Sequence, residues 1–173
     1  MRIGLRIFLG FLLIAALAAW FLARTFTQEV RPGVRQGMEV ALGDAANLLA
    51  EVAGPELKAG TLAEGPFSEA VRRYRERRPK SQVWGLEPGG PGFRVYATDW
   101  EGRVVYDSAG EAVGQDYSRR NDVYLTLRGR YGARSTRADP TDPATSVMHV
   151  AAPILEEGRI AGVLTVANAT SSV

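Results

Sequence analysis

The feature that most constrains this chain is an uninterrupted apolar run close to its N-terminus. No charged residue lies between Arg6 and Arg24, and the run from Ile7 to Ala23 reads IFLGFLLIAALAAWFLA. As a helix with a rise of about 1.5 Å per residue this run spans roughly 26 Å, slightly less than a hydrocarbon core of about 30 Å. Arginine side chains at both ends can snorkel toward the headgroups and cover the difference. The run therefore predicts a transmembrane helix over residues 7–24.

A cleaved signal peptide is the alternative explanation of this run. Arg2 and Arg6 form a basic n-region, and the triplet Ala16-Leu17-Ala18 fits a cleavage site. That triplet lies inside the apolar run, which is longer than the usual h-region of about 7–15 residues, so a retained anchor is favoured. The two arginines place residues 1–6 in the cytoplasm, although arginines on the far side of the run weaken the bias.

Composition excludes several kinds of site. Removing Arg2, Arg6 and Arg24 from the 21 basic residues leaves 18 against 19 acidic ones. A nearly neutral domain has no electrostatic footprint for nucleic acid, so no nucleic-acid partner is expected. The chain has no cysteine, which excludes disulfides, cysteine-bound zinc and a thiol nucleophile. No phosphate-binding loop is present, and neither a cofactor nor a metal is expected.

The rest of the chain predicts one α+β domain over residues 25–168. Apolar residues at gaps of three and four predict a long helix that ends at Gly54-Pro55. Its apolar stripe consists of Val34, Met38, Leu42, Ala45, Leu48, Leu49 and Val52. A second helix is predicted from Pro66 to Arg78, with Phe67, Val71 and Tyr74 on its buried face and Pro79 stopping it.

A mostly antiparallel sheet with one inserted helix is predicted to follow. Its strands are expected near Phe93–Thr98, Arg103–Ser108, Arg134–Arg137, Ser146–Leu155 and Arg159–Asn168. The inserted helix is expected to be capped by Asn121 or Asp122 and closed at Gly129. Loops are expected at residues 85–92 and 138–145, where glycine, proline and aspartate are frequent.

Several short motifs carry a resemblance that covers essentially the whole chain. They are MRIG at the start, AAW before Arg24, VGQDYSR, NDV, LTLRG, YGARST and SVM-x-VAAPI. The element order, with D-x-x-G in the turn of a hairpin, resembles the extracytoplasmic PAS-like (Cache/PDC-type) sensor domains of bacterial receptors. The motifs themselves are similar to those of the N-terminal region of the CreC family of sensor histidine kinases.

This resemblance implies an inner-membrane receptor with a periplasmic sensor domain. It further implies that residues 169–173 are a linker toward a missing second transmembrane helix, followed by a cytoplasmic kinase that phosphorylates a CreB-type response regulator. The single histidine, His149, lies in a strand pattern instead of a helical phosphoacceptor box, so this segment is not expected to be an enzyme. The alternatives are a PAS-like sensor of a chemoreceptor or cyclase, and a membrane-anchored periplasmic binding protein or enzyme.

In PAS-like sensors the ligand lies between the sheet and the segment that covers it, which here is expected to be residues 114–129. Arginine binds carboxylates bidentately and tyrosine supplies an apolar wall with one hydroxyl, so a small anionic ligand is the hypothesis. A periplasmic partner protein is the alternative stimulus. The candidate ligand-binding residues are Tyr96, Tyr106, Tyr117, Arg119, Arg128, Tyr131, Arg134 and Ser135.

A structural role is the competing explanation for each of these residue types. The arginines could be surface residues paired with Asp116 or Asp122. Asp99 and Asp107, at the hairpin ends, are expected to bind backbone N–H groups and shape turns. A lone strand histidine is more often core or surface than ligand, and the family pattern implies aromatic residues at the positions of Arg120 and His149, so neither is expected to share a ligand role.

The connectivity also predicts a route for the signal. The membrane segment leads into the first helix of the domain, and a symmetric homodimer would pair these helices. The outward positions expected to make that contact are Arg35, Glu39 and Ala46.

Overall fold

The structure is a computed structural model, and it describes residues 2–25, 31–77, 92–137, 139, 141 and 145–169. The predicted loop before residue 92, the stop at Pro79, most of the predicted loop at residues 138–145 and the predicted linker after residue 169 lie outside these residues. The chain divides into two compact units, residues 1–38 and residues 39–173.

The first unit contains α1 (Arg2–Thr25), which confirms the predicted apolar helix. From Ile3 to Thr25 it is long and apolar enough to cross a membrane, with a mean hydropathy of 2.3. The guanidinium of Arg24 lies 5.4 Å from the ring of Trp20. Such a pair of an aromatic and a cation is typical of the boundary between lipid and water.

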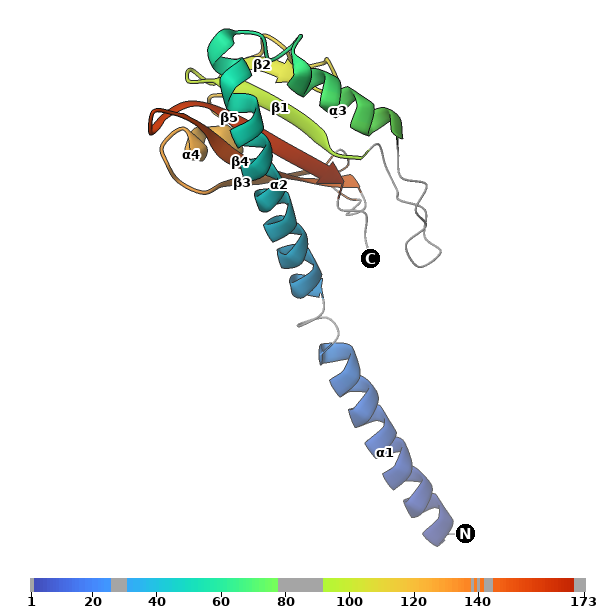
Figure 1. Cartoon of the computed structure of the whole chain (residues 1–173). Helices are drawn as coiled ribbons and strands as arrows, with labels where there is room; N and C mark the ends of the chain where they lie inside the picture. The colour runs from blue at the N-terminus through green and yellow to red at the C-terminus, as the bar shows by residue number, and fades with distance from the viewer. Residues whose placement is uncertain are drawn as a thin grey trace. The chain divides into compact units, whose positions relative to one another are not determined.

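The second unit is built on one five-stranded sheet with the order β2-β1-β5-β4-β3 (Figure 1). Every neighbouring pair in this sheet is antiparallel. The strands are β1 (Arg94–Asp99), β2 (Val104–Asp107), β3 (Gly132–Arg137), β4 (Ser146–Glu156) and β5 (Arg159–Ala169). The α+β class, the antiparallel sheet and all five strand positions are therefore confirmed, with bounds within two residues of the predicted ones.

The helix α2 (Arg31–Ala59) begins in the first unit, and its part within the second unit covers one face of the sheet through mostly small residues. Its buried positions are Leu42, Ala46, Ala50 and Ala53. A Cβ added to Gly43 would lie 3.8 Å from Val150, and one added to Gly54 would lie 3.7 Å from Ile154. The helix therefore lies close to β4 because these side chains are short.

The predicted buried face of α2 is wrong: the observed face is rotated by about one position along the helix. Leu48 and Val52, which were expected to be buried, are 68% and 55% exposed, whereas Ala46, which was expected to face outward, is fully buried. Sequence periodicity follows the largest apolar residues, but a close approach to β4 requires the smallest ones. Alanines therefore occupy the buried face.

The predicted end of α2 at Gly54-Pro55 is also wrong. The helix continues to Ala59 and ends at Gly60, whose φ of +70° permits a left-handed cap. The N–H of Gly60 donates to the carbonyl of Leu57 (3.1 Å), and that of Thr61 donates to Glu56 (2.9 Å). Pro55 is tolerated because the carbonyl that loses its helical donor belongs to Glu51, which lies on the exposed side.

The shorter helix α3 (Pro66–Arg77) lies against the same face of the sheet. Phe67 and Val71 are buried, and the ring of Phe67 meets that of Tyr106 edge-on at 5.5 Å. The carboxylate of Glu56 accepts a hydrogen bond from the N–H of Phe67 at 2.9 Å, so α2 caps the start of α3. Tyr74, predicted to be buried, is 41% exposed and stacks on Phe93.

The third helix of this unit, α4 (Asn121–Thr126), covers the opposite face of the sheet. Between it and the sheet lies a cluster of buried residues that consists of Tyr96, Val104, Ala112, Tyr117, Val123, Ala151 and Val163. The predicted closure at Gly129 is confirmed by its φ of +67°. The predicted cap is wrong: Arg120 is the N-cap residue and makes no side-chain cap bond, because Asp122 is used elsewhere.

Candidate functional site: a buried polar network under α4

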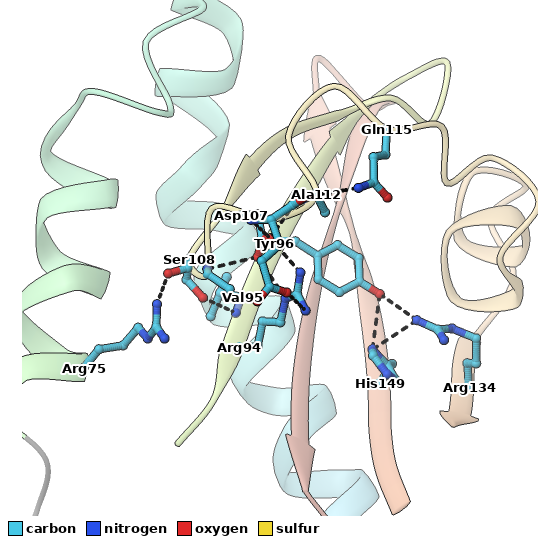
Figure 2. Close-up of polar contacts among 12 residues, drawn as sticks. Arg75, Arg94, Val95, Tyr96, Asp107, Ser108, Ala112, Gln115, Arg134 and His149 are labelled. Atoms are coloured by element: carbon cyan, nitrogen blue, oxygen red, sulfur yellow. Dashed lines mark hydrogen bonds and ion pairs between the residues drawn. The ribbon is translucent and has the colours of Figure 1, made fainter. Parts of the chain in front are cut away.

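A network of polar side chains lies between α4 and the sheet. Strand alternation places Tyr96, Thr165, His149 and Arg134 on the face that α4 covers, one from each of β1, β5, β4 and β3. Figure 2 shows Tyr96, Arg134 and His149 converging from three strands. Asp122 reaches the same point from the first turn of α4.

Asp122 is the anion at the centre of this network, and its side chain is fully buried. It accepts hydrogen bonds from the Nε of Arg134 (2.8 Å), from the hydroxyl of Tyr96 and, more weakly, from the hydroxyl of Thr165 (3.4 Å). Burial alone would raise the pKa of Asp122, but the hydrogen bond from Tyr96 and the charge of Arg134 outweigh it and hold the pKa below its usual range. Asp122 is therefore ionised, and it fastens α4 to β1 and β3.

The tautomer of His149 follows from its neighbours. Arg134 Nη2 lies 3.2 Å from Nδ1 of the imidazole, and a guanidinium has only donors, so Nδ1 must be the acceptor. The proton is then on Nε2, which donates to the hydroxyl of Thr136 at 3.1 Å. Burial, together with the charge of Arg134, lowers the pKa of His149 to about 4. His149 is neutral at pH 7.

The network is closed on itself. Arg134 Nη2 also donates to the hydroxyl of Tyr96 at 3.3 Å, and burial beside the Asp122 charge raises the pKa of Tyr96 well above its usual value. Each charged or polar group in the network thus meets a complementary partner. The arrangement holds α4 in place and can respond to a change of protonation. Nothing in it resembles an activated nucleophile with its base.

Only part of the predicted ligand set meets at this point. Tyr96 and Tyr117 share the space, with ring centroids 5.5 Å apart at 89°. Tyr106 does not share it, because Tyr106 pairs with Ala97 and both point to the face covered by α3. Tyr131 is 62% exposed and donates its hydroxyl proton to Glu39 at 2.6 Å.

The predicted arginines have different surroundings. Arg134 is paired with Asp122, as the competing hypothesis expected, but in the interior instead of on the surface. Arg128 lies over the ring of Tyr124 at 3.6 Å and is exposed, as is Arg119. Ser135 is exposed, one position along β3 from Arg134 and therefore on the other face. The eight predicted residues do not form one pocket.

Sequence reasoning missed Asp122, His149 and Thr165 as members of one site. His149 was expected to be core or surface, and it is 8% exposed. The usable signal was alternation: in SVMHVAAPI, His149 shares a face with Ala151. The meeting of β3, β4 and α4 depends on strand pairing between distant segments, which no local pattern gives.

A second buried carboxylate, Asp107, organises the loop after β2. It accepts two hydrogen bonds from Arg94, at 3.0 and 2.7 Å, and further ones from the N–H groups of Ala109, Glu111 and Ala112 (Figure 2). Asp99 similarly accepts from the N–H groups of two residues in its turn, 101 and 103. The structure thus agrees with the expectation that both aspartates shape turns.

Comparison with known proteins adds to this geometry. No family model matches the chain. The chain is 50% identical over 166 residues to the sensor protein CreC of Escherichia coli (strain K12). This chain is similar to CreC along almost its whole length. The match covers 96% of the chain and 35% of CreC, so the chain spans about a third of that relative. The predicted resemblance to a CreC-type sensor is confirmed.

One solved sensor domain supports the fold. The chain is similar to the sensor domain of the Vibrio cholerae histidine kinase DctB, with a TM-score of 0.55 and 15% identity over 88% of this chain and 56% of that one. Its likeness to the E. coli DcuS sensor domain has a TM-score of 0.35 and 16% identity, over 70% of this chain and 91% of that one. The likeness to DctB confirms the fold predicted from the sequence.

Proposed function

We propose that this chain is the extracytoplasmic sensor region of a membrane-bound two-component histidine kinase. It detects an envelope or metabolic signal and passes it across the inner membrane to a cytoplasmic kinase, which phosphorylates a CreB-type response regulator. The observation that carries the proposal is the 50% identity to a sensor protein over 96% of the chain. The sensor-domain fold supports it. The segment itself supplies detection, and the kinase resides in another part of the receptor.

A chimera tests the sensor role. The matched 166 residues of CreC are replaced by this chain, and phosphorylation of the response regulator is followed while growth conditions change. A sensor should restore regulated phosphorylation. Output that stays constant under every condition, at the level of a CreC variant lacking its sensor, would contradict the proposal. A chemoreceptor or cyclase sensor, the alternative, would be identified by the module encoded downstream of residue 173.

The proposed topology places residues 1–6 in the cytoplasm, residues 7–24 in the membrane and residues 25–168 in the periplasm, with residues 169–173 leading toward a second span. The apolar length of α1 supports this arrangement. An alkaline phosphatase fusion after residue 173 should be active, a fluorescent protein at the same site should stay dark, and the chain should resist carbonate extraction. Release of a soluble domain that begins near Ala19 would contradict a retained anchor.

A homodimer through α2 is part of the proposal. Ala41, Ala45, Leu48 and Val52 follow one another at gaps of four, three and four, the spacing of a coiled-coil seam. Leu48 and Val52 are more than half exposed, whereas the sheet-facing alanines are buried. A second copy of the chain would bury this seam, and a shift between two paired helices would carry the signal toward the membrane.

A small anion, if it is the stimulus, has one favoured location among the described residues. Arg134 already binds Asp122, but Arg119 and Arg128 line an open hollow of about 510 Å³ together with Trp100 and Tyr124. Carboxylates screened by thermal shift should stabilise the chain, by about 2.7 kcal/mol at 100 times Kd. The shift should be lost in Arg119→Ala and Arg128→Ala and kept in Arg130→Ala. A hit that binds all three variants equally would exclude this hollow.

A further inference from the structure

The donor and acceptor pattern around His149 admits only the neutral imidazole. Nδ1 faces Nη2 of Arg134 at 3.2 Å and the hydroxyl of Tyr96 at 3.4 Å. The Tyr96 proton is given to Asp122, so the lone pair of Nδ1 is the acceptor for Arg134. A proton added to that lone pair would turn the acceptor into a donor, and two cationic N–H groups would then point at each other.

The charged groups around His149 do not stabilise a protonated imidazole. Arg134 on β3, Arg120 at the N-cap of α4 and Arg94 on β1 all disfavour a cationic imidazole. Of the described charged groups that influence His149 most, Asp122 is the anion. Asp122 is already bound by Arg134, Tyr96 and Thr165. His149 is 8% exposed, so water screens the repulsion only weakly.

Arg134, which a protonated His149 would repel, is also the residue that binds Asp122 of α4. Arg134 joins His149 to Asp122, and Asp122 is in the first turn of α4. β3 is an edge strand with a neighbour on one side only, so it is freer to move than the central strands. Separation of Arg134 from a cationic imidazole would therefore weaken the Arg134–Asp122 pair and release α4 from the sheet.

We propose that protons are a stimulus of this domain, and that His149, Arg134 and Asp122 form an acid-sensitive latch between α4 and the sheet. At neutral pH the latch is closed. Acidification adds a proton to Nδ1 of His149, Arg134 withdraws and α4 loosens. The lowered pKa of His149 means that the latch opens between about pH 6.5 and pH 4. The latch follows from the contacts alone, whereas its use as a signal rests on the sensor role proposed above.

The single histidine of the chain makes the latch directly measurable. The whole chain, residues 1–173, is labelled with ¹⁵N-histidine, purified with a tag that contains no histidine and placed in lipid nanodiscs. At about pH 7.5 the imidazole should be the neutral tautomer protonated at Nε2, and it should titrate with a midpoint well below the ordinary 6.5. A tautomer protonated at Nδ1, or a midpoint at or above 6.5, would overturn the latch.

Hydrogen exchange tests the release of α4. After correction for intrinsic rates, amides in residues 121–137 should exchange at least about tenfold faster at about pH 4.5 than at about pH 7.5, while those of β5 should change little. His149→Asn places a carbonyl acceptor near the position of Nδ1 and cannot bind a proton, so its exchange should not depend on pH over this range. Exchange of residues 121–137 in the unmutated chain that does not change across the titration would overturn the proposal whether or not the variant folds.

The CreC chimera separates the two proposals. Output that changes with acid in the unmutated chimera and not in His149→Asn supports proton sensing. Output that responds to other conditions but is the same at both pH values overturns proton sensing and leaves the sensor role in place. Output that never responds overturns the sensor role and proton sensing together, and the spectroscopic titration then decides the latch by itself.

Discussion

Asp107 illustrates at the scale of one residue how a buried carboxylate organises a loop in this domain. Its side chain is fully buried, and its oxygens bind one guanidinium and three backbone N–H groups. Burial alone would raise the pKa of Asp107, but the hydrogen bonds from Arg94 and from the loop lower it. The charged form therefore stabilises the fold at neutral pH. This contribution is lost as the pH falls through the lowered value.

Asp107→Ala should destabilise the domain by about 3 kcal/mol, because Arg94 and the loop N–H groups lose their common acceptor. Glu111→Ala is the matched control. Glu111 also pairs with Arg94, at 3.1 Å, but its side chain is 72% exposed, so its loss should cost less than about 1 kcal/mol. Urea unfolding of both variants at pH 7 checks this, and equal losses would show that burial of the pair contributes nothing.

The sequence could predict the role of Asp107 but not that of Asp122. Asp107 satisfies donors two to five residues ahead of it, a local pattern that loop aspartates repeat across proteins. Asp122 was assigned to a cap for the same reason. Its actual partners, Tyr96, Arg134 and Thr165, lie 26, 12 and 43 residues away. Only the folded sheet brings those together.

At the scale of an element, α4 depends on the absence of a side chain at Gly132, the first residue of β3. A Cβ at this position would collide with the carbonyl of Asp122 and the hydroxyl of Thr126. Gly132→Ala should therefore lift α4 from β3 and destabilise the domain by about 2–3 kcal/mol.

Gly110→Ala is the control for that change. Gly110 has a φ of +75° and open space around it, so alanine there meets backbone strain alone and should cost about 1 kcal/mol. Thermal unfolding of both variants compares them. A smaller loss of stability in Gly132→Ala than in Gly110→Ala would mean that α4 can move away from β3 without destabilising the domain.

The helix α2 shows which part of an element a sequence predicts well. Its existence and its start follow from periodicity and from Pro32. Its buried face does not, because the apolar residues form two stripes. The alanine stripe packs on β4, and the larger side chains of Leu48 and Val52 remain exposed. Periodicity alone cannot tell which stripe meets the sheet.

Single cysteines along α2 test the second stripe. If the receptor and dimer proposed above are right, Leu48→Cys and Val52→Cys in the full-length protein should form disulfide-linked dimers under mild oxidation, because a second copy would place equivalent seam positions opposite each other. Ala46→Cys and Ala50→Cys are controls that should remain monomeric, since both positions are buried against the sheet. Crosslinking at Ala46 with none at Leu48 would exclude this seam.

At the scale of the whole molecule, the sheet is completed by β5, the last strand in the part of the chain that the structure describes. β5 lies between β1 and β4 and hydrogen-bonds to both. Within the described sheet, the hairpin of β1 and β2 therefore has no strand-to-strand pairing with β3 or β4 and is joined to them through β5. A chain that ends after Gly158 should fail to fold, with protease sensitivity throughout residues 92–156. Protection in that truncated chain would show that β1 and β4 can hold together without β5.

The position of β5 also determines how late in synthesis and export the sheet can form. The pairs Arg94–Ala167 and Val95–Val166 join residues about 70 positions apart, and such distant pairing is slow. In the topology proposed above, residues 25–168 would be exported in chain order behind the retained anchor, and the strand edges that pair with β5 would stay exposed until residue 169 had emerged. During that interval the unfolded segment would bind periplasmic chaperones and be open to proteolysis. Under the proposed topology, chains stalled early in export would then be cleared, and only chains whose β5 has emerged could fold.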